Sequence, residues 1–138
     1  MLLSVKNLAT HFHAGPERIA RAVDGVSFDL QQGKTLALVG ESGCGKTQTA
    51  FSIMQLIAEN GYHPSGEIFF EKKDLSKLNQ EEIRHLRGND IAMIFQEPMT
   101  SLNPLFRIGN QLQEPLKQHL KVLQGASRKR AIELLDRV

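Results

Sequence analysis

Residues 40–47 read Gly-Glu-Ser-Gly-Cys-Gly-Lys-Thr and fit the phosphate-binding pattern G-x-x-x-x-G-K-[ST], also called Walker A or the P-loop. Glycines have no Cβ, so such a loop can adopt positive φ and turn its amide hydrogens inward around phosphate oxygens. A helix that begins near Lys46 adds the positive end of its dipole there. Lys46 can reach the β and γ phosphates, and the Thr47 hydroxyl is positioned as a ligand for Mg²⁺. The sequence therefore predicts a phosphate site for a nucleoside triphosphate.

The flanking sequence has the strand, loop and helix order that such a loop requires. Residues 36–39 are apolar without alternation, which predicts a strand covered on both faces. After the loop, a helix is predicted from the apolar spacing of Ala50, Ile53, Met54 and Ile57. Upstream, residues 26–30 alternate and predict a half-buried strand. Turns are predicted on either side of it, at residues 24–25 and 32–34.

The middle of the sequence continues with short elements. The patterns predict a loop over residues 61–66 that contains Pro64, a strand over 68–70, a helix over about 80–87 and a buried strand over 91–95. Asn79 is a good N-cap for the helix, because Glu82 falls three positions later and completes a capping box. Gly88 is expected to stop this helix.

Two helices are predicted near the end of the sequence. The first has one apolar face, formed by Ile108, Leu112, Leu116, Leu120 and Leu123. Pro115 must kink or divide it. Ser127 can cap the second helix, in which Glu133 and Arg137 have the spacing of an ion pair. The apolar period still runs at Val138, so we expect the sequence to stop within an element.

The composition is that of one globular domain at most. The 138 residues are 41% apolar and 23% charged, and the net charge of +2 comes from interspersed charges, which argues against nucleic acid as a partner. The apolar stretch over residues 51–58 is far shorter than the roughly 20 residues of a membrane helix. No secretory signal is recognised, so we expect a soluble chain in the cytoplasm. The single cysteine, Cys44, cannot form an internal disulfide.

Three stretches together resemble the ATP-binding subunits of oligopeptide and dipeptide ABC importers. They are AVDGVSFDL at residues 22–30, GESGCGKTQTA at 40–50 and MIFQEPMTSLNP at 93–104, in which Asn103-Pro104 is the part most specific to peptide and nickel importers. The resemblance implies an α/β fold of the ABC-type P-loop NTPase class, truncated. Its expected parts are an antiparallel β subdomain (1–34), a portion of the P-loop core (35–102) and the start of a helical subdomain (103–138).

The resemblance also implies roles for single residues. Gln96 would be the glutamine of the Q-loop, which contacts Mg²⁺ and the attacking water, unless it is only a polar residue that ends a strand. Phe12 falls where the family places an aromatic ring on adenine, with Val23 beside it, although a phenylalanine there is often core. Cys44 departs from the serine usual in this family. Beside Lys46 at a helix start it is a candidate reactive thiol or a tolerated small residue.

The expected site residues follow from the loop and the resemblance together. For ATP binding they are Phe12, Val23, Gly40, Glu41, Ser42, Gly43, Cys44, Gly45, Lys46, Thr47 and Gln48. Gln96 and Lys46 are the expected catalytic residues, and Thr47 and Gln96 the expected Mg²⁺ ligands. His11 and His13 can share a strand face, but two imidazoles without a third ligand are more often surface residues than a metal site.

The function implied by the resemblance is ATP binding in a transport ATPase that energises uptake of peptides or related solutes. Its partners would be membrane permease subunits, a second ATPase subunit and, indirectly, a solute-binding protein, and it would lie peripherally on the cytoplasmic face of the inner membrane. Complete members carry an LSGGQ-type signature, a Walker B aspartate, a glutamate base and a switch histidine beyond the point where this sequence stops. We therefore expect the chain to bind ATP without hydrolysing it alone.

Other functions stay open or are disfavoured. The chain could be a non-catalytic nucleotide-binding module or an inert fragment of a truncated or split gene. A small-molecule kinase would need a lid and a substrate pocket, which the sequence does not reveal. A GTPase is disfavoured because no Asn-Lys-x-Asp sequence is present to recognise guanine.

Overall fold

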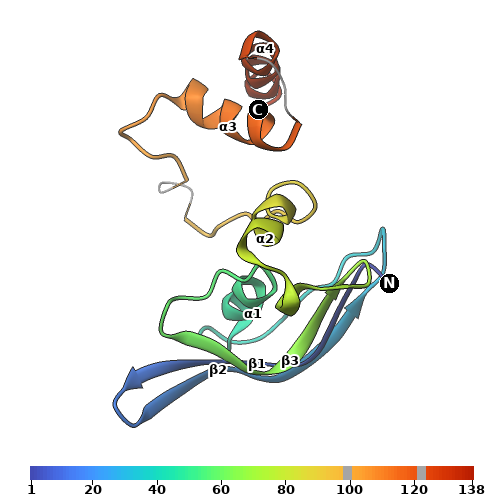
Figure 1. The fold of residues 1–138 in the computed structure, drawn as a ribbon, viewed down its shortest axis with the longest axis vertical. Coiled ribbons are helices and arrows are strands. Elements are labelled where there is room, and N and C mark those ends of the chain that lie inside the picture. The colour runs from blue at the N-terminus through green and yellow to red at the C-terminus, as the bar shows by residue number, and fades with distance from the viewer. Residues whose placement is uncertain (98–100, 121–123) are drawn as a thin grey trace. The chain divides into compact units, whose positions relative to one another are not determined.

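The computed structural model describes residues 1–97, 101–120 and 124–138. It divides into two compact units, Met1–Ile83 and Arg84–Val138. Figure 1 shows an antiparallel sheet with α1 in the first unit and the helices α3 and α4 in the second. The predictions for Leu123 and for residues 98–100 lie outside the described residues.

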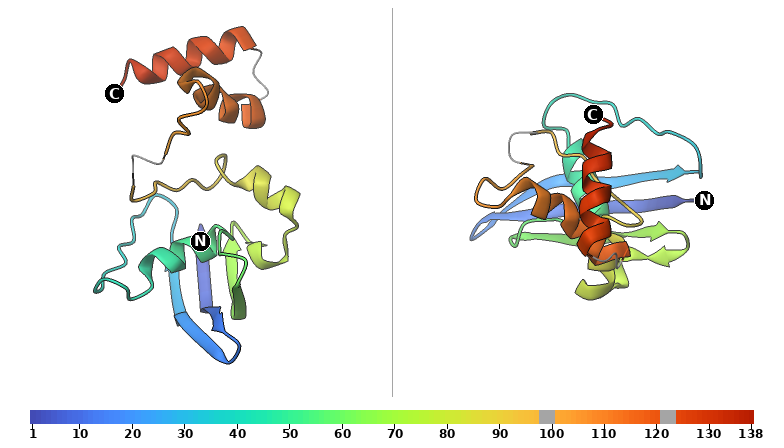
Figure 2. Two further views of the ribbon diagram at one scale, coloured as in Figure 1. Left: turned by 90° about the vertical axis from the view of Figure 1, so that its left-hand side faces the viewer. Right: turned by 90° about the horizontal axis from the view of Figure 1, so that it is seen from above.

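The first unit is built on a sheet with the strand order β2-β1-β3-β4. Its strands are β1 Leu3–Gly15, β2 Arg18–Leu30, β3 Gly61–Phe70 and β4 Lys73–Asp74. The helix α1, Lys46–Ile53, lies over one face of the sheet (Figures 1 and 2). The apolar core of this unit is formed by Val5, Leu8, Ala9, Val23, Met54, Ile68, Leu75 and Ile83. The alternation predicted over residues 26–30 is confirmed as the last part of β2, and β3 joins the sheet from within residues 35–102.

The turn predicted at residues 24–25 is wrong, because these residues form a β-bulge inside β2. The neighbouring cross-strand pairs are Leu8 with Val26 and Thr10 with Val23. Three steps along β2 therefore match two along β1, and Gly25 absorbs the extra residue with φ of 73°. An Asp-Gly pair suits a turn or a bulge equally well, so the pattern alone does not distinguish them. The turn predicted at residues 32–34 is confirmed by the bond from the Lys34 amide to the Gln31 carbonyl oxygen.

The loop predicted over residues 61–66 is also wrong, since β3 runs through it. Pro64 lies at an irregularity of the pairing, between the pairs Ser65 with Ala9 and Tyr62 with His11. On the other side, β4 pairs only with Phe69 and Phe70, so Pro64 lies on an edge where β4 needs no hydrogen bond from it. Proline is tolerated in strands at such places.

The two buried strands predicted over residues 36–39 and 91–95 are not formed. Val39 is 93% exposed and Ile94 is 98% exposed. Ile91 makes one isolated parallel bridge, with Arg87. A strand of this apolar type needs neighbouring strands for its backbone and cover for both faces. Among the described residues no named strand pairs with either segment.

The predicted capping box is confirmed at the start of α2, Gln80–Leu86. The Asn79 amide donates to Glu82 Oε2 at 2.8 Å, and the Glu82 amide donates to Asn79 Oδ1 at 3.0 Å. Gly88 follows the helix with φ of 81°, as expected of a residue that stops it. These contacts are local, which is why the sequence alone predicts them.

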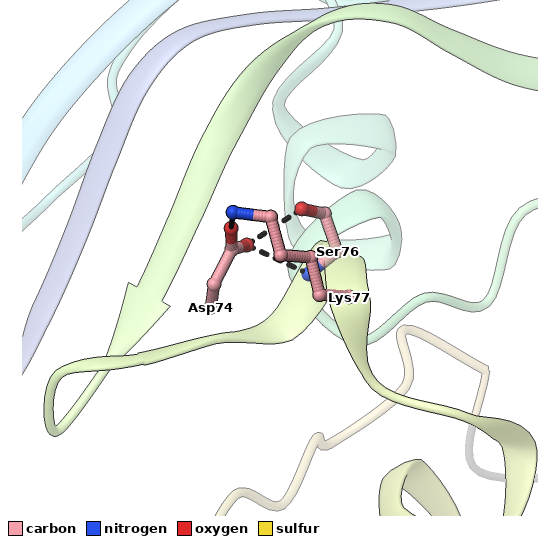
Figure 3. A network of polar contacts seen from close by, with 3 residues as sticks. All are labelled: Asp74, Ser76 and Lys77. Carbon is pink, nitrogen blue, oxygen red and sulfur yellow. Dashed lines mark hydrogen bonds and ion pairs between the residues drawn. The ribbon is translucent and has the colours of Figure 1, made fainter.

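A polar cluster closes the turn η1, Leu75–Lys77, at the end of β4. Asp74 accepts hydrogen bonds from the Ser76 amide and hydroxyl, and it forms an ion pair with Lys77 at 2.7 Å (Figure 3). Burial acts to raise the pKa of the Asp74 carboxyl, but the bonds from Lys77 and Ser76 outweigh it, so the pKa lies below its ordinary value. The cluster stabilises the turn η1, whose first residue, Leu75, is buried in the core.

The second unit contains α3, Ile108–Leu120, and α4, Gln124–Leu135. Pro115 lies inside α3 and does not divide it. Ser127 is not an N-cap, because α4 begins three residues earlier and the buried Ser127 hydroxyl donates to Gln113 Oε1 of α3 at 2.9 Å. Glu133 pairs with Arg130 at 3.1 Å and not with the predicted Arg137. Within the described residues, no helix combines the length and apolarity of a membrane crossing.

Candidate functional site

The loop over residues 40–47 lies between residues 36–39, which belong to no named strand, and the start of α1. Gly43 has φ of 80° and Gly45 has φ of 92°, and Gly45 is the N-cap of α1. Both values lie in the left-handed region, which side chains other than that of glycine rarely adopt. The glycines at these two positions are therefore required by the backbone of the loop.

Lys46 lies across the loop at the first position of α1. Its Nζ donates to the carbonyl oxygens of Gly40 at 2.7 Å and Glu41 at 2.6 Å, and it lies 3.4 Å from Cys44 Sγ. A lysine ammonium has three donors and no acceptor, so these contacts occupy its bonding capacity. The ammonium thus lies on the loop that is expected to hold phosphates.

The loop is anchored to the sheet through Gly45. A Cβ added to Gly45 would lie 2.3 Å from the carbonyl oxygen of Ala22 and 3.8 Å from Val23 Cγ2. Val23, which the resemblance places beside adenine, is 4% exposed and packs under the start of α1. Within α1, the Thr49 hydroxyl donates to the Gly45 carbonyl oxygen at 2.9 Å and closes the first turn of the helix. A side chain at residue 45 would push the helix off the sheet.

The other predicted loop residues lie on the same surface. Glu41, Ser42, Cys44 and Thr47 are exposed, and Gln48 is half-buried in the first turn of α1. A Cβ on Gly40 would lie 2.6 Å from Cys44 Sγ, so the thiol covers Gly40. The structure brings the whole predicted loop set together at one end of α1. Within the described residues, no cluster of three or more His, Cys, Asp or Glu side chains could hold a metal ion.

Phe12 lies in β1 and is half-buried against β3. A Cβ on Gly61 would lie 2.7 Å from the Phe12 Cε1 atom, so the ring packs directly on the Gly61 backbone. His13 stacks on Tyr62 with ring centroids 4.9 Å apart, and His11 meets the edge of Tyr62 at 5.9 Å. The two predicted surface histidines are therefore part of an aromatic cluster around Tyr62.

Gln96 lies in the second unit, at an exposed bend after residues 91–95. Its assignment to the Q-loop therefore stays a prediction from the sequence. The loop residues and Phe12 belong to the first unit.

Three polar residues next to the site were missed by the sequence analysis. Thr10 and Ser52 are fully buried, and their hydroxyl oxygens are 2.7 Å apart between β1 and α1. His63 Nδ1 lies 3.1 Å from Thr10 Oγ1. A threonine in a strand and a serine in a helix carry no signal of such a contact, because their meeting depends on strand pairing and helix placement.

Comparison with known proteins identifies the family. The sequence profile described as ABC transporter matches residues 23–138. The chain is 49% identical to the dipeptide transport ATP-binding protein DppD of Lactococcus lactis subsp. cremoris over 99% of its own length and 39% of DppD. It is also 49% identical to the oligopeptide transport ATP-binding protein OppD of Bacillus subtilis, over 99% of this chain and 38% of OppD. The chain thus spans less than half of the length of these relatives.

The fold matches a solved ATP-binding cassette. The dimeric, post-hydrolysis structure of MJ0796 bound to ADP and Pi is similar with a TM-score of 0.82 and 25% identity, over 98% of this chain and 56% of that chain. This likeness confirms the predicted fold class, although residues 36–39 and 91–95 form no strands here. The chain belongs to the ABC transporter family, and its fold is that of the family's ATP-binding cassette.

Proposed function

We propose that the chain binds ATP with Mg²⁺ and is the nucleotide-binding portion of an ABC transporter ATPase that energises uptake of peptides or related solutes. The observation that carries the proposal is the seating of Gly45 on Ala22, which directs the start of α1 and the Lys46 ammonium to one loop. The 49% identity to proteins named for dipeptide and oligopeptide transport supports the solute class.

The loop residues fit a polyphosphate. Gly43 and Gly45 have the left-handed φ values that such a loop requires, and the N-terminus of α1 favours negative charge. Lys46 would exchange the carbonyl oxygens of Gly40 and Glu41 for the β and γ phosphates. Thr47 and Gln96 would hold Mg²⁺, which neutralises phosphate charge when it is bound.

The proposal also covers the residues that would contact adenine and the boundaries of the subdomains. Phe12 would stack on adenine, and Val23, packed beneath Gly45, would fix the loop beside it. Residues 1–34 would form the antiparallel β subdomain, 35–102 the portion of the P-loop core and 103–138 the start of the helical subdomain. The pairing of β1 with β2 supports the first division in part, since β3 from residues 35–102 also pairs with β1, and the bond between α3 and α4 supports the third.

The proposed partners are those of a transport ATPase. They are membrane permease subunits, a second ATPase subunit and, indirectly, a solute-binding protein. The chain would lie peripherally on the cytoplasmic face of the inner membrane. The second subunit is supported by the dimeric form of the similar MJ0796 cassette, and the permease by the transport names of the relatives.

We further propose that these 138 residues bind ATP without hydrolysing it alone. After Gln96 no apolar run ends in Asp-Glu, and no Ser-Gly-Gly is present. Phosphoryl transfer depends on positioning and on charges that act as a unit, so the loop without a water-activating group should give no partial activity. The second candidate is a non-catalytic nucleotide-binding module.

Nucleotide binding is tested with a fluorescent ATP analogue. Lys46→Ala should abolish detectable binding, because the cation that reaches the phosphates is lost. Lys34→Ala is the matched control, since it removes an exposed lysine of the same unit outside the loop and should bind like the wild type. Unchanged affinity in Lys46→Ala would remove this residue from the site.

Hydrolysis is tested by phosphate release from the chain alone and after addition of a second polypeptide that carries the remaining family motifs. We expect release only in the mixture. Release by neither sample would favour the non-catalytic module. Steady turnover by the purified chain, lost in Lys46→Ala, would mean that a catalytic base lies within these 138 residues.

A further inference from the structure

A buried chain of hydrogen bonds joins the sheet to α1. His63 in β3 lies 3.1 Å from Thr10 in β1, measured from Nδ1 to Oγ1. The Thr10 hydroxyl lies 2.7 Å from the Ser52 hydroxyl in α1, and both residues are fully buried. Ser52 in turn donates to the carbonyl oxygen of Gln48 at 2.6 Å. The chain therefore leads from β3, through β1, to the first turn of the helix that begins at the phosphate loop.

The direction of the protons in this chain is set by its last acceptor. The carbonyl oxygen of Gln48 can only accept, so Ser52 uses its single proton there and Thr10 donates to Ser52. Thr10 then accepts from His63 Nδ1, which also lies 3.3 Å from the carbonyl oxygen of Ala9. The Thr10 hydroxyl thus bonds His63 in the sheet and Ser52 in the helix.

Strands β1 and β3 also carry Phe12, the residue expected to contact the adenine ring, and Gly61, on which it packs. Phe12 follows Thr10 by two residues in β1, and its ring packs on Gly61, two residues before His63 in β3. The phosphate-reaching Lys46 stands at the start of α1, the helix that Ser52 bonds to β1. The separation between the base contact and the phosphate loop therefore depends on how α1 is seated on β1.

We propose that the bond between Thr10 and Ser52 sets the distance between the adenine site at Phe12 and the phosphate loop. Thr10 is then a positioning residue for ligands that occupy both places. This inference rests on the proposed function. A nucleotide spans both places and binds best when their spacing matches its length, whereas a polyphosphate without a base meets the loop alone. Loss of the bond should therefore weaken binding of ATP selectively.

The test compares ATP with tripolyphosphate as ligands of the 138-residue chain, by calorimetry. Thr10→Val keeps the side-chain shape and removes the hydroxyl. It should lower the affinity for ATP about threefold to tenfold and that for tripolyphosphate less than about twofold. Thr10→Ser restores a hydroxyl and should bind ATP within about twofold of the wild type. The matched control is Ser127→Ala, which removes a buried hydroxyl bond to Gln113 in the second unit and should not change either affinity.

The outcomes separate the inference from the proposed function. A wild-type chain that binds neither ligand would refute nucleotide binding itself. If the wild type binds both, equal losses for the two ligands in Thr10→Val would mean that Thr10 only stabilises α1, and no loss would mean that the bond does not set the spacing. Either result overturns the inference. If Thr10→Val does not fold, Ser52→Ala removes the partner hydroxyl and should show the same selective loss of ATP affinity.

Discussion

Replacement of Gly45 by alanine is expected to displace the start of α1 from β2. Gly45 has φ of 92°, and a Cβ there would lie 2.3 Å from the Ala22 carbonyl oxygen, well short of the 3.4–4 Å of an ordinary contact. The atom that it meets belongs to the backbone of a paired strand and cannot rotate away, so the helix has to shift. Because α1 begins with Lys46 and Thr47, the shift moves the phosphate-binding groups as well.

The expected loss of stability has two parts. A left-handed conformation costs a residue with a side chain about 1–2 kcal/mol. Overpacking against a fixed backbone adds about 1–3 kcal/mol. For a chain of this size, 1 kcal/mol corresponds to a change of roughly 3–5 °C in Tm, so Gly45→Ala should lower Tm by roughly 6–25 °C.

The assay is thermal unfolding followed by circular dichroism, together with binding of a fluorescent ATP analogue. Gly33→Ala is the matched control, because Gly33 has φ of 71° and open space around its Cβ position. The control should show the conformational cost alone and bind nucleotide like the wild type. If Gly45→Ala melted within about 2 °C of Gly33→Ala and bound nucleotide normally, the reasoning from the Ala22 contact would be refuted.

Three further changes have expected outcomes. Cys44, which is exposed, should react with a maleimide, and Mg-ATP should slow the reaction; an unchanged rate at saturating ATP would place the thiol away from the phosphates. Asp74→Asn should lower the stability at pH 7 by about 1 kcal/mol. Because the Asp74 pKa lies below its ordinary 3.8, this difference in Tm should be present above that pH and vanish as the pH falls further, so a difference that grows in acid would contradict the assignment. Asn79→Ala should cost about 1 kcal/mol in thermal unfolding, whereas Asn79→Asp should retain the cap.

The features that the sequence predicts correctly depend on neighbours in the chain. The capping box of Asn79 and Glu82 closes within three residues, and the glycine positions in residues 40–47 follow from backbone geometry. The helix after the loop is predicted in part by its own apolar spacing: α1 begins at Lys46 as expected but ends at Ile53, so Ile57 lies outside it. In each case the interacting groups are adjacent, so no knowledge of the tertiary fold is needed.

The features that the sequence predicts wrongly depend on partners elsewhere in the chain. The apolar pattern of residues 36–39 predicts a strand that is covered on both faces. Such a strand forms only beside a neighbouring strand, and the pattern does not reveal whether one is present. Pro64 predicts a loop from the sequence alone, because the irregular strand pairing that accommodates it is seen only in the structure. Ser127 likewise predicts an N-cap from the sequence alone, whereas in the structure its hydroxyl donates to Gln113 of α3. The candidate site shows the same division, since Thr10 and Ser52 meet only after β1 and α1 have packed.

The phosphate loop is held firmly on one side. Gly45 packs on Ala22, whereas residues 36–39, which lead into the loop, belong to no named strand of the described structure. On that leading side the Lys46 ammonium ties the helix to the carbonyl oxygens of Gly40 and Glu41. A phosphate that draws Lys46 away breaks both bonds, each of the charged kind worth about 1.5–3 kcal/mol. Binding therefore replaces an internal cross-link with one through the ligand, and a ligand with several phosphates replaces it more completely than a single phosphate does.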